Sequence, residues 1–224
     1  NELYTTTTHM DDFLRRDLLT PKLDRIHRFL WLAGLPRPPR PLHRQRLLGR
    51  QIYATENPDE HLVWHGNRIF IKPLPEYLLN NAFWMKHIAV DRSLHQSACG
   101  LMLSYIWLVS NRNDLRIAIE AGLMPEAMEW KTWAALVLDV LNRIDTKSLR
   151  QVDRRYLYGE LRLTRLNSLY RFGVGGFSLF TLVHGFMMGS ERYDTFFQRN
   201  FGWILALLLY VTVVLSAIQV ALAT

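Results

Sequence analysis

Two histidines with acidic neighbours are the residues of this chain whose spacing could hold a metal ion. His61 and His65 lie four positions apart, directly after Asp59 and Glu60. On a helix, two such histidines could share a zinc ion. The β-branched and aromatic residues around them, followed by a Gly-Asn turn, instead predict a strand. Positions four apart in a strand are separated by about 13 Å, so we expect no metal site here.

Motifs for catalysis or cofactor binding are absent from the sequence. There is no Gly-x-Ser-x-Gly elbow, phosphate-binding loop, GxGxxG, HExxH or paired CxxC. The one cysteine, Cys99, stands in an apolar run over 98–109. We interpret it as a small buried side chain, because a nucleophilic thiolate needs a base and polar surroundings. The sequence therefore favours a protein without catalytic residues or cofactors.

A histidine inside an apolar segment is the most notable single ionisable residue. His184 lies in 172–189, a stretch without Lys, Arg, Asp or Glu. An ionisable group at membrane depth suggests a functional site, such as a pore. Alternatively, a neutral imidazole is hydrogen-bonded to Ser178, Thr181 or a partner backbone. Gly185 and Gly189 form a small-xxx-small pair that would let another helix approach closely.

Two C-terminal segments have the composition of membrane spans. The segment 201–223 has no charged residue in 23 positions and would rise about 34 Å as a helix, enough to cross a bilayer. The segment 172–189 is shorter, at 18 positions, and contains five glycines. We interpret it as a second span that packs against 201–223 or against a neighbouring chain, with a re-entrant or interfacial segment as the alternative.

Basic residues before the first predicted span set the expected orientation. The loop 190–200 has only Arg192 and Arg199 as basic residues, so the positive-inside rule places the large N-terminal region in the cytosol of a multi-pass membrane protein. The segment 154–171 mixes arginines with Leu and Tyr, which suits either a helix resting on an anionic leaflet or one packed into the domain. Its candidate lipid contacts are Arg154, Arg155, Arg162, Arg165 and Arg171.

A second basic stretch, 35–50, holds four prolines and five arginines. Proline blocks regular structure, so we expect an extended connector. It would serve as a ligand for a proline-binding domain, as a lipid-headgroup contact, or simply as a solvated linker. The net charge of +7 also suits nucleic acid, but the chain has no recognisable reading module, and we expect no such partner.

The elements that position these residues are predicted to be mainly helical. Strand-favouring residues occur around 51–55 and 62–72, and we expect a small β-hairpin or a three-stranded sheet there. Helical periodicity dominates from 76 onward, and the apolar run 98–109 is too short to span a bilayer, which assigns it to a domain core. The predicted fold is a helical cytosolic domain with a small hairpin, followed by a two-helix transmembrane hairpin. The expected regions are 1–50, 51–171 and 172–224.

Several strings resemble an uncharacterised family of fungal integral membrane proteins. The match runs in order over about four-fifths of the chain, and the resemblance implies C-terminal spans and no assigned activity. Some members carry a subtilisin-like protease label, but no matching Ser, His and Asp motifs occur here. The strings are LHRQ at 42–45, HLVW at 61–64, IFIKPLPEYLL at 69–79, FW at 83–84, LSYIWLV at 103–109, DLRIAIEAGLMP at 114–125, YGELRLTRLNSLYR at 158–171 and FFQRNFGWILALLLYVTVVLSAIQVALAT at 196–224.

A coarser likeness is to two-span magnesium channels, which place a large cytosolic domain before a C-terminal hairpin. Their Gly-Met-Asn signature is absent, and Met-Met-Gly-Ser stands at 187–190 instead. The leading hypothesis is therefore a membrane-anchored cytosolic module that binds a protein or anionic lipid. The alternative is an oligomeric pore or ion-transporter subunit assembled from several copies of the chain.

Overall fold

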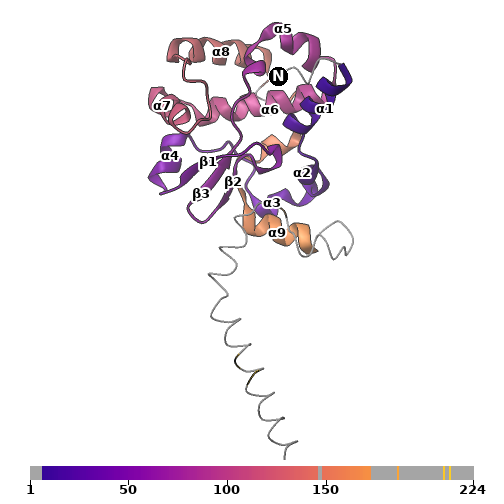
Figure 1. Cartoon of the computed structure of the whole chain (residues 1–224), viewed down its shortest axis with the longest axis vertical. Coiled ribbons are helices and arrows are strands. Elements are labelled where there is room, and N and C mark those ends of the chain that lie inside the picture. The colour runs from indigo at the N-terminus through magenta and orange to yellow at the C-terminus, as the bar shows by residue number, and fades with distance from the viewer. Residues whose placement is uncertain (1–6, 146–147, 173–185, 187–208, 210–211, 213–224) are drawn as a thin grey trace, which may run out of the picture. The chain divides into compact units, whose positions relative to one another are not determined.

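The computed structural model describes residues 7–145, 148–172, 186, 209 and 212 (Figure 1). The chain divides into two compact units, Asn1–Phe186 and Met187–Thr224, and the elements described below belong to the first. The helices are α1 (Thr7–Leu18), α2 (Pro21–Arg25), η2 (His27–Phe29), α3 (Leu30–Ala33), α4 (Leu42–Leu47), η3 (Pro58–Glu60), η4 (Glu76–Leu79), α5 (Asn81–Phe83), the π-helical η5 (Trp84–Ile88), α6 (Arg92–Leu108), α7 (Arg112–Glu120), α8 (Trp130–Arg143), η6 (Arg154–Leu157) and α9 (Leu163–Phe172).

A four-stranded mixed sheet accompanies these helices, in the order β1-β3-β2-β4. The strands are β1 (Gln51–Ala54), β2 (Val63–His65), β3 (Arg68–Ile71) and β4 (Leu161–Arg162). β2 and β3 form an antiparallel hairpin around Gly66, whose φ of 57° is readily adopted by glycine. β1 pairs in parallel with β3, and β4 pairs in parallel with β2.

The predicted mainly helical fold class is wrong, because the first unit is mixed α and β. The sheet extends beyond the expected hairpin or three-stranded sheet through β4, whose parallel pairing with β2 joins Leu161 to Val63. Parallel partners are necessarily distant along the chain, so no local pattern around 161 indicates a strand. The periodicity there predicted helix, but between the 3-10 helix η6 and the α-helix α9 the chain forms β4.

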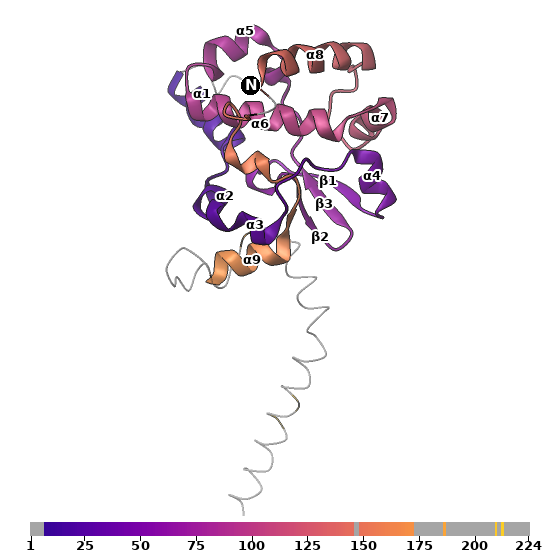
Figure 2. The ribbon, with the colours of Figure 1, turned by 180° about the vertical axis from the view of Figure 1, so that it is seen from behind.

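The buried core is organised around α6. In both ribbon views α6 lies between the sheet on one side and α5 with α8 on the other (Figures 1 and 2). Its side chains are buried along most of its length, including Leu94, Leu103 and Leu108. At Gly100 a β-carbon would overlap the ring of Tyr156, so the absence of a side chain lets η6 approach α6 closely. The prediction that 98–109 is core is confirmed.

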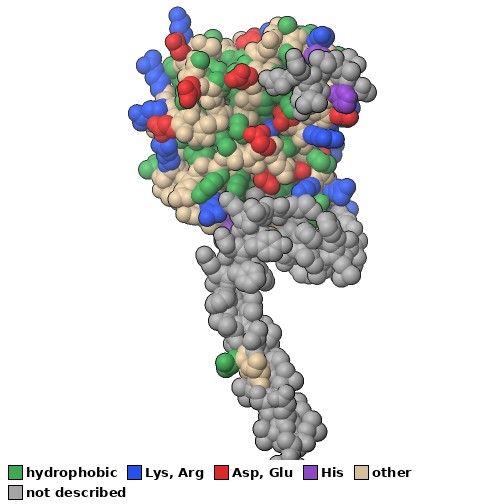
Figure 3. Space-filling view, viewed as in Figure 1, with side chains coloured by type: hydrophobic (Ala, Val, Ile, Leu, Met, Phe, Trp, Pro, Cys, Tyr) green, Lys and Arg blue, Asp and Glu red, His purple; other side chains and the backbone are tan. Residues whose placement is uncertain are grey.

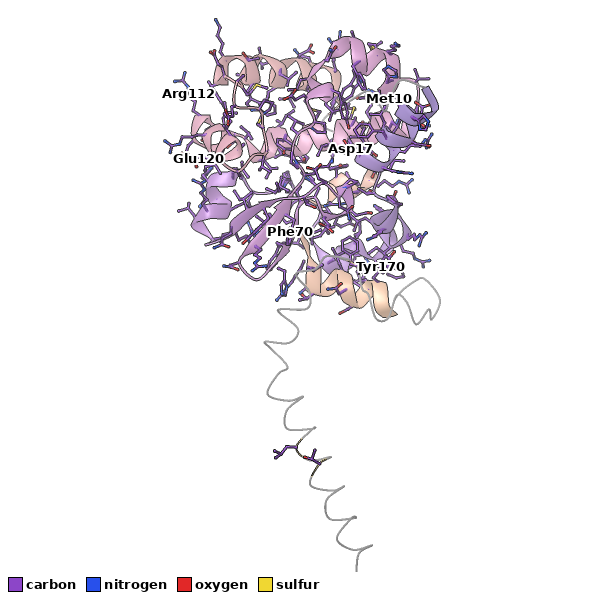
Figure 4. All side chains as sticks on the ribbon, in the orientation of Figure 1. Met10, Asp17, Phe70, Arg112, Glu120 and Tyr170 are labelled. Carbon is purple, nitrogen blue, oxygen red and sulfur yellow. The ribbon has the colours of Figure 1, made fainter. Side chains whose placement is uncertain are left out.

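A buried ion pair links α1 to the end of the sheet. Lys72 is only 2% exposed, and its Nζ donates to Asp17 Oδ1 at 2.7 Å. The hydroxyl of Tyr77 also donates to the Asp17 carboxylate, whose side chain is 16% exposed and which is labelled in Figure 4. Burial and the negative charge of Asp17 raise the pKa of Tyr77, so the tyrosine stays a hydrogen-bond donor. These bonds satisfy a lysine that would otherwise be costly to bury.

The basic stretch 35–50 is held against the sheet by one carboxylate. Glu160, just before β4, accepts hydrogen bonds from Arg40 Nη1 at 3.1 Å and from Arg50 Nη1 at 2.7 Å. Gln45 Nε2 donates to the same carboxylate at 2.9 Å. Residues 42–47 form α4 rather than extended chain. Arg37, Arg44 and other residues of this stretch still face solvent, so the expected role in protein binding stays a prediction.

In the part of the chain that the structure describes, no helix is both long and apolar enough to cross a membrane. This finding overturns the predicted transmembrane hairpin and the multi-pass membrane localisation. Most of the predicted spans, 172–189 and 201–223, lie outside the described residues. Phe186, which is described, is only 1% exposed, and its N–H donates to Asn167 Oδ1 at 2.9 Å. Phe186, a residue of the predicted span 172–189, therefore packs against α9. A stretch without charged residues did not by itself establish a membrane span.

Candidate anion-binding site

A polar cavity of about 630 Å³ lies where three segments of the first unit meet. The first segment comprises α2 and η2, the second is the N-terminal part of α6, and the third is 148–157. In Figure 2 the orange segment that carries η6 lies beside α6. The cavity is lined by Asp24, His27, Arg92, Gln96, Ser148, Leu149, Arg150, Val152, Asp153, Arg154 and Leu157.

Backbone hydrogen bonds fix the third segment against α6. Asp91 caps α6 by accepting two backbone N–H groups of the first turn, as expected for an N-cap aspartate. One turn later, the Gln96 carbonyl accepts the N–H of Asp153 at 3.0 Å. The Gln96 side chain donates to the carbonyl of Arg150, also at 3.0 Å. These bonds hold the basic residues of 148–157 beside Arg92.

Three arginines line this cavity without a counter-charge of their own. Arg92, Arg150 and Arg154 are all exposed. Among the described residues, none of their guanidinium groups has a hydrogen-bond or ion-pair partner. Some other surface arginines are paired, as Arg46 is with Glu120 at 2.8 Å, and Figure 3 shows charges of both signs spread over one face. Unpaired guanidinium groups that converge on one cavity are suited to binding an anion.

Asp24 is the lining residue whose pKa is most altered. Desolvation raises the pKa of Asp24 from its ordinary value of 3.8 to about 6, and the negative charges of Asp153 and Asp59 add to the shift. Thr20 and His27 oppose it. Asp24 therefore changes charge near neutral pH, and protonation of its carboxylate removes one negative charge from the cavity.

His27 presents a defined tautomer to the same cavity. Its Nε2 lies 3.3 Å from the carbonyl oxygen of Arg154. A carbonyl oxygen only accepts, so Nε2 carries the proton and Nδ1 is the acceptor in the neutral ring. The ring also contacts Tyr158 edge-on, with centroids 6.0 Å apart. His27 therefore joins η2 to η6 and contributes to the position of Arg154.

Behind the cavity wall lies a second, buried layer of charge. Asp59 is 3% exposed and accepts the N–H of Leu23 at 3.1 Å, at the start of α2. Arg155 is 1% exposed and donates to the carbonyls of His61 and Tyr158. Burial lowers the pKa of Arg155 to about 10, which leaves it charged at neutral pH. Asp59 thus holds the backbone just before Asp24, and Arg155 holds the backbone that follows Arg154.

The structure separates the five arginines that the sequence groups into one basic surface. Arg154 lines the cavity, whereas Arg155 is buried behind it. Arg162 is exposed on β4 with its guanidinium carbon 5.3 Å from the centroid of Trp64. Arg165 donates to the carbonyl of Leu32 at 3.0 Å. The side chain of Arg171 is outside the described part, as are the candidate pore residues Ser178, Thr181, His184, Gly185 and Gly189.

Of the two histidines considered for metal binding, His65 ends β2, whereas His61 precedes the strand and is separated from it by Leu62, whose φ is 62°. His61 is buried; its Nδ1 accepts the N–H of Lys72 at 3.1 Å, and its Nε2 lies 2.8 Å from Ser104 Oγ. Burial and the charges of Arg155 and Lys72 lower the pKa of His61, so its ring is neutral. The ring Nε2 must donate to Ser104, and a histidine in this state cannot act as the base for that serine.

Sequence reasoning found one cavity residue, Arg154, and missed the others. Asp24, Arg92 and Arg150 lie in three separate segments that no motif links. The available signal was the concentration of arginine around 150–155, which indicated a basic surface without its counterpart on α2. The raised pKa of Asp24 arises from neighbours brought together by folding.

No curated protein matches this chain, and no solved structure matches it. A family model, described as a family of unknown function (DUF6601), matches residues 10–224. That match covers nearly all of the chain, including the three segments that form the cavity. The chain belongs to this family of unknown function, DUF6601.

Proposed function

We propose that the protein is a non-enzymatic binding module that captures an anionic group of a protein partner in the arginine-lined cavity. The observation that carries this proposal is the convergence of Arg92, Arg150 and Arg154, each unpaired among the described residues, on one cavity. Guanidinium groups bind phosphate and carboxylate through paired N–H donors. Clusters of arginine are a recurring way to recognise phosphorylated or acidic segments of proteins.

The acidic residues of the cavity favour a ligand that also carries hydrogen-bond donors. Asp24 and Asp153 line the same space as the arginines. An ionised carboxylate only accepts hydrogen bonds. A peptide satisfies both requirements, because its backbone N–H groups can donate to the aspartates while its phosphate or carboxylate meets the arginines.

The openness of the site supports a macromolecular partner over a free metabolite. All three arginines are solvent-exposed in the cavity wall. Sites for free small molecules bury most of the ligand surface, whereas a partner protein adds contacts outside the cavity. The same chemistry is present in lipid headgroups, which the experiment separates from a protein partner. A fungal source, implied by the resemblance of the sequence strings, is part of this proposal.

The first experiment measures binding of inorganic pyrophosphate to the full chain by titration calorimetry at low salt. We expect Arg154→Gln to weaken binding about tenfold, which corresponds to about 1.4 kcal/mol for one charge-assisted contact. Arg44→Gln is the matched control, because Arg44 is exposed on α4 and does not line the cavity. Absence of pyrophosphate binding, or equal weakening in both variants, would refute the proposal.

A second experiment identifies the carrier of the anionic group. The wild-type chain and Arg154→Gln are screened against paired phosphoserine and serine peptides, and against vesicles of phosphatidylcholine with phosphatidylserine. Phosphopeptide binding that is lost in Arg154→Gln supports a protein partner. Vesicle binding that depends on Arg154, without phosphopeptide binding, would replace the protein partner by a lipid headgroup.

A further inference from the structure

A second cavity, of about 350 Å³, lies on the other side of α6 from the sheet. Its walls come from η4 to η5, from α6, and from α8 with the segment that follows it. This volume is within the range of small-molecule sites in proteins. The lining residues are Leu78, Leu79, Asn81, Trp84, Met85, Ala89, His95, Cys99, Met102, Leu136, Asp139, Val140, Arg143, Ile144 and Gln151.

Most of this lining is apolar and adaptable in shape. Trp84 supplies a large ring, and Met85 and Met102 supply unbranched side chains that adjust to irregular ligands. Trp84 and Met85 also begin η5, a five-residue π-helical turn. Such turns are uncommon in proteins as a whole, but those that occur are often at functional sites. The cavity wall is therefore formed in part by an unusual helix geometry.

The charged residues of the lining neutralise one another. Arg143 Nε donates to Asp139 Oδ1 at 3.0 Å, one turn apart on α8. Desolvation lowers the pKa of His95, so its ring is neutral at neutral pH. Asn81 and Gln151 are uncharged amides. The cavity thus offers hydrogen bonds without an unpaired charge, in contrast to the arginine-lined cavity.

We propose that this second cavity binds an uncharged, mainly apolar small molecule that carries one or two hydrogen-bonding groups. The apolar walls favour burial of hydrocarbon or aromatic surface. A charged ligand group would lose its hydration without gaining a counter-charge, because Asp139 and Arg143 are already paired. This site is separate from the proposed function and does not depend on it.

Binding in this cavity is non-covalent. Cys99 lines it, and its Sγ lies 3.8 Å from the ring nitrogens of His95. Burial raises the pKa of the Cys99 thiol to about 12, so the nucleophilic thiolate is not populated at neutral pH. The thiol therefore contributes a soft apolar surface to the wall.

The test uses N-phenylnaphthylamine, an uncharged fluorescent probe, with the full chain. Ala89→Trp places a bulky ring on an exposed lining residue, and the control Val90→Trp alters the next residue, which is 80% exposed and outside the cavity. We expect Ala89→Trp to weaken probe binding at least tenfold and Val90→Trp to bind as the wild type does. A wild type without probe binding, or equal binding by both variants, overturns the proposal.

A second pair of variants approaches the cavity from α8. Leu136→Trp fills the lining, whereas Leu138→Trp changes a residue that is 64% exposed and outside it. Circular dichroism and the unfolding midpoint check that each variant is folded. The ligand class is tested with anilinonaphthalene sulfonate, which has the same ring system and a negative charge. Sulfonate binding as tight as that of the neutral probe, and equally reduced in Ala89→Trp, would contradict an uncharged ligand.

Discussion

At the scale of single residues, Asp24 controls the charge of the arginine-lined cavity. Its pKa of about 6 results first from desolvation and then from Asp153 and Asp59. The folded state therefore binds this proton more tightly than the unfolded chain does. As pH rises from about 4 to about 6, the unfolded chain loses this proton before the folded protein does, so Asp24 makes a progressively unfavourable contribution to folding. Loss of the same proton adds a negative charge beside the three arginines.

Pyrophosphate binding should therefore strengthen as pH falls from 7.5 to 5.5, after correction for ionisation of the pyrophosphate itself. In Asp24→Asn this dependence should largely disappear, and affinity at pH 7.5 should rise about threefold to tenfold, because a neutral amide replaces a carboxylate. Calorimetric titrations across this pH range check the prediction. Asp12→Asn, an exposed change on α1, should keep the wild-type profile. An unchanged profile in Asp24→Asn would exclude Asp24 as the titrating group.

At the scale of elements, Glu160 holds the basic stretch 35–50 against the sheet. Its side chain is 11% exposed, and that of Arg50 is 9% exposed. Burial alone would raise the pKa of Glu160, but hydrogen bonds from Arg50, Arg40 and Gln45 outweigh it and hold the pKa below its ordinary value. The stability that Glu160 contributes is therefore present near neutral pH and is lost as pH falls through its folded pKa.

We expect Glu160→Gln to lower the free energy of unfolding by about 3 kcal/mol, because Arg50 would keep a buried charge without a counter-ion. Chemical denaturation at pH 7 measures the change. Glu120→Gln is the control, since Glu120 forms an ion pair with Arg46 in which both side chains are 48% exposed. That change should cost less than about 1 kcal/mol. Similar losses in the two variants would show that Glu160 is not a buried anchor.

At the scale of the whole molecule, the two cavities differ in electrostatic character while sharing one segment of chain. Arg150 and Val152 line the polar cavity, and Gln151 between them lines the apolar one. The chain carries a formal charge of +7, which adds a long-range attraction for anions but none for a neutral ligand. Ionic strength is therefore a way to separate the two sites.

Raising NaCl from about 0.1 M to about 1 M shortens the Debye length from about 10 Å to about 3 Å. Pyrophosphate binding should weaken about tenfold or more across this range. Binding of N-phenylnaphthylamine should stay constant or strengthen slightly, since salt does not weaken apolar burial. The two probes are titrated into the same preparation of full chain. Equal salt dependence of both would contradict the assignment of different ligand classes to the cavities.

Several local features followed from the sequence by itself. The glycine turn at 66, the burial of 98–109 and the absence of a common catalytic motif are properties of residues close together in the chain. Side-chain periodicity and turn chemistry report such features, because they depend on neighbours only a few positions away. The helical interpretation of 154–171 holds in η6 and α9 but is wrong at Leu161–Arg162, since β4 exists only through its pairing with β2.

Only the tertiary structure decided the sheet order, the burial of Arg155 apart from Arg154, and the meeting of Asp24 with Arg92 and Arg150. It also contradicted the spans assigned from hydropathy, because no described helix has the length and apolarity required, and Phe186 is buried against α9. Charge and hydropathy along a chain describe the properties of each residue separately. Which charges share a cavity, and which apolar residues share a core, depends on packing between segments that are distant in sequence.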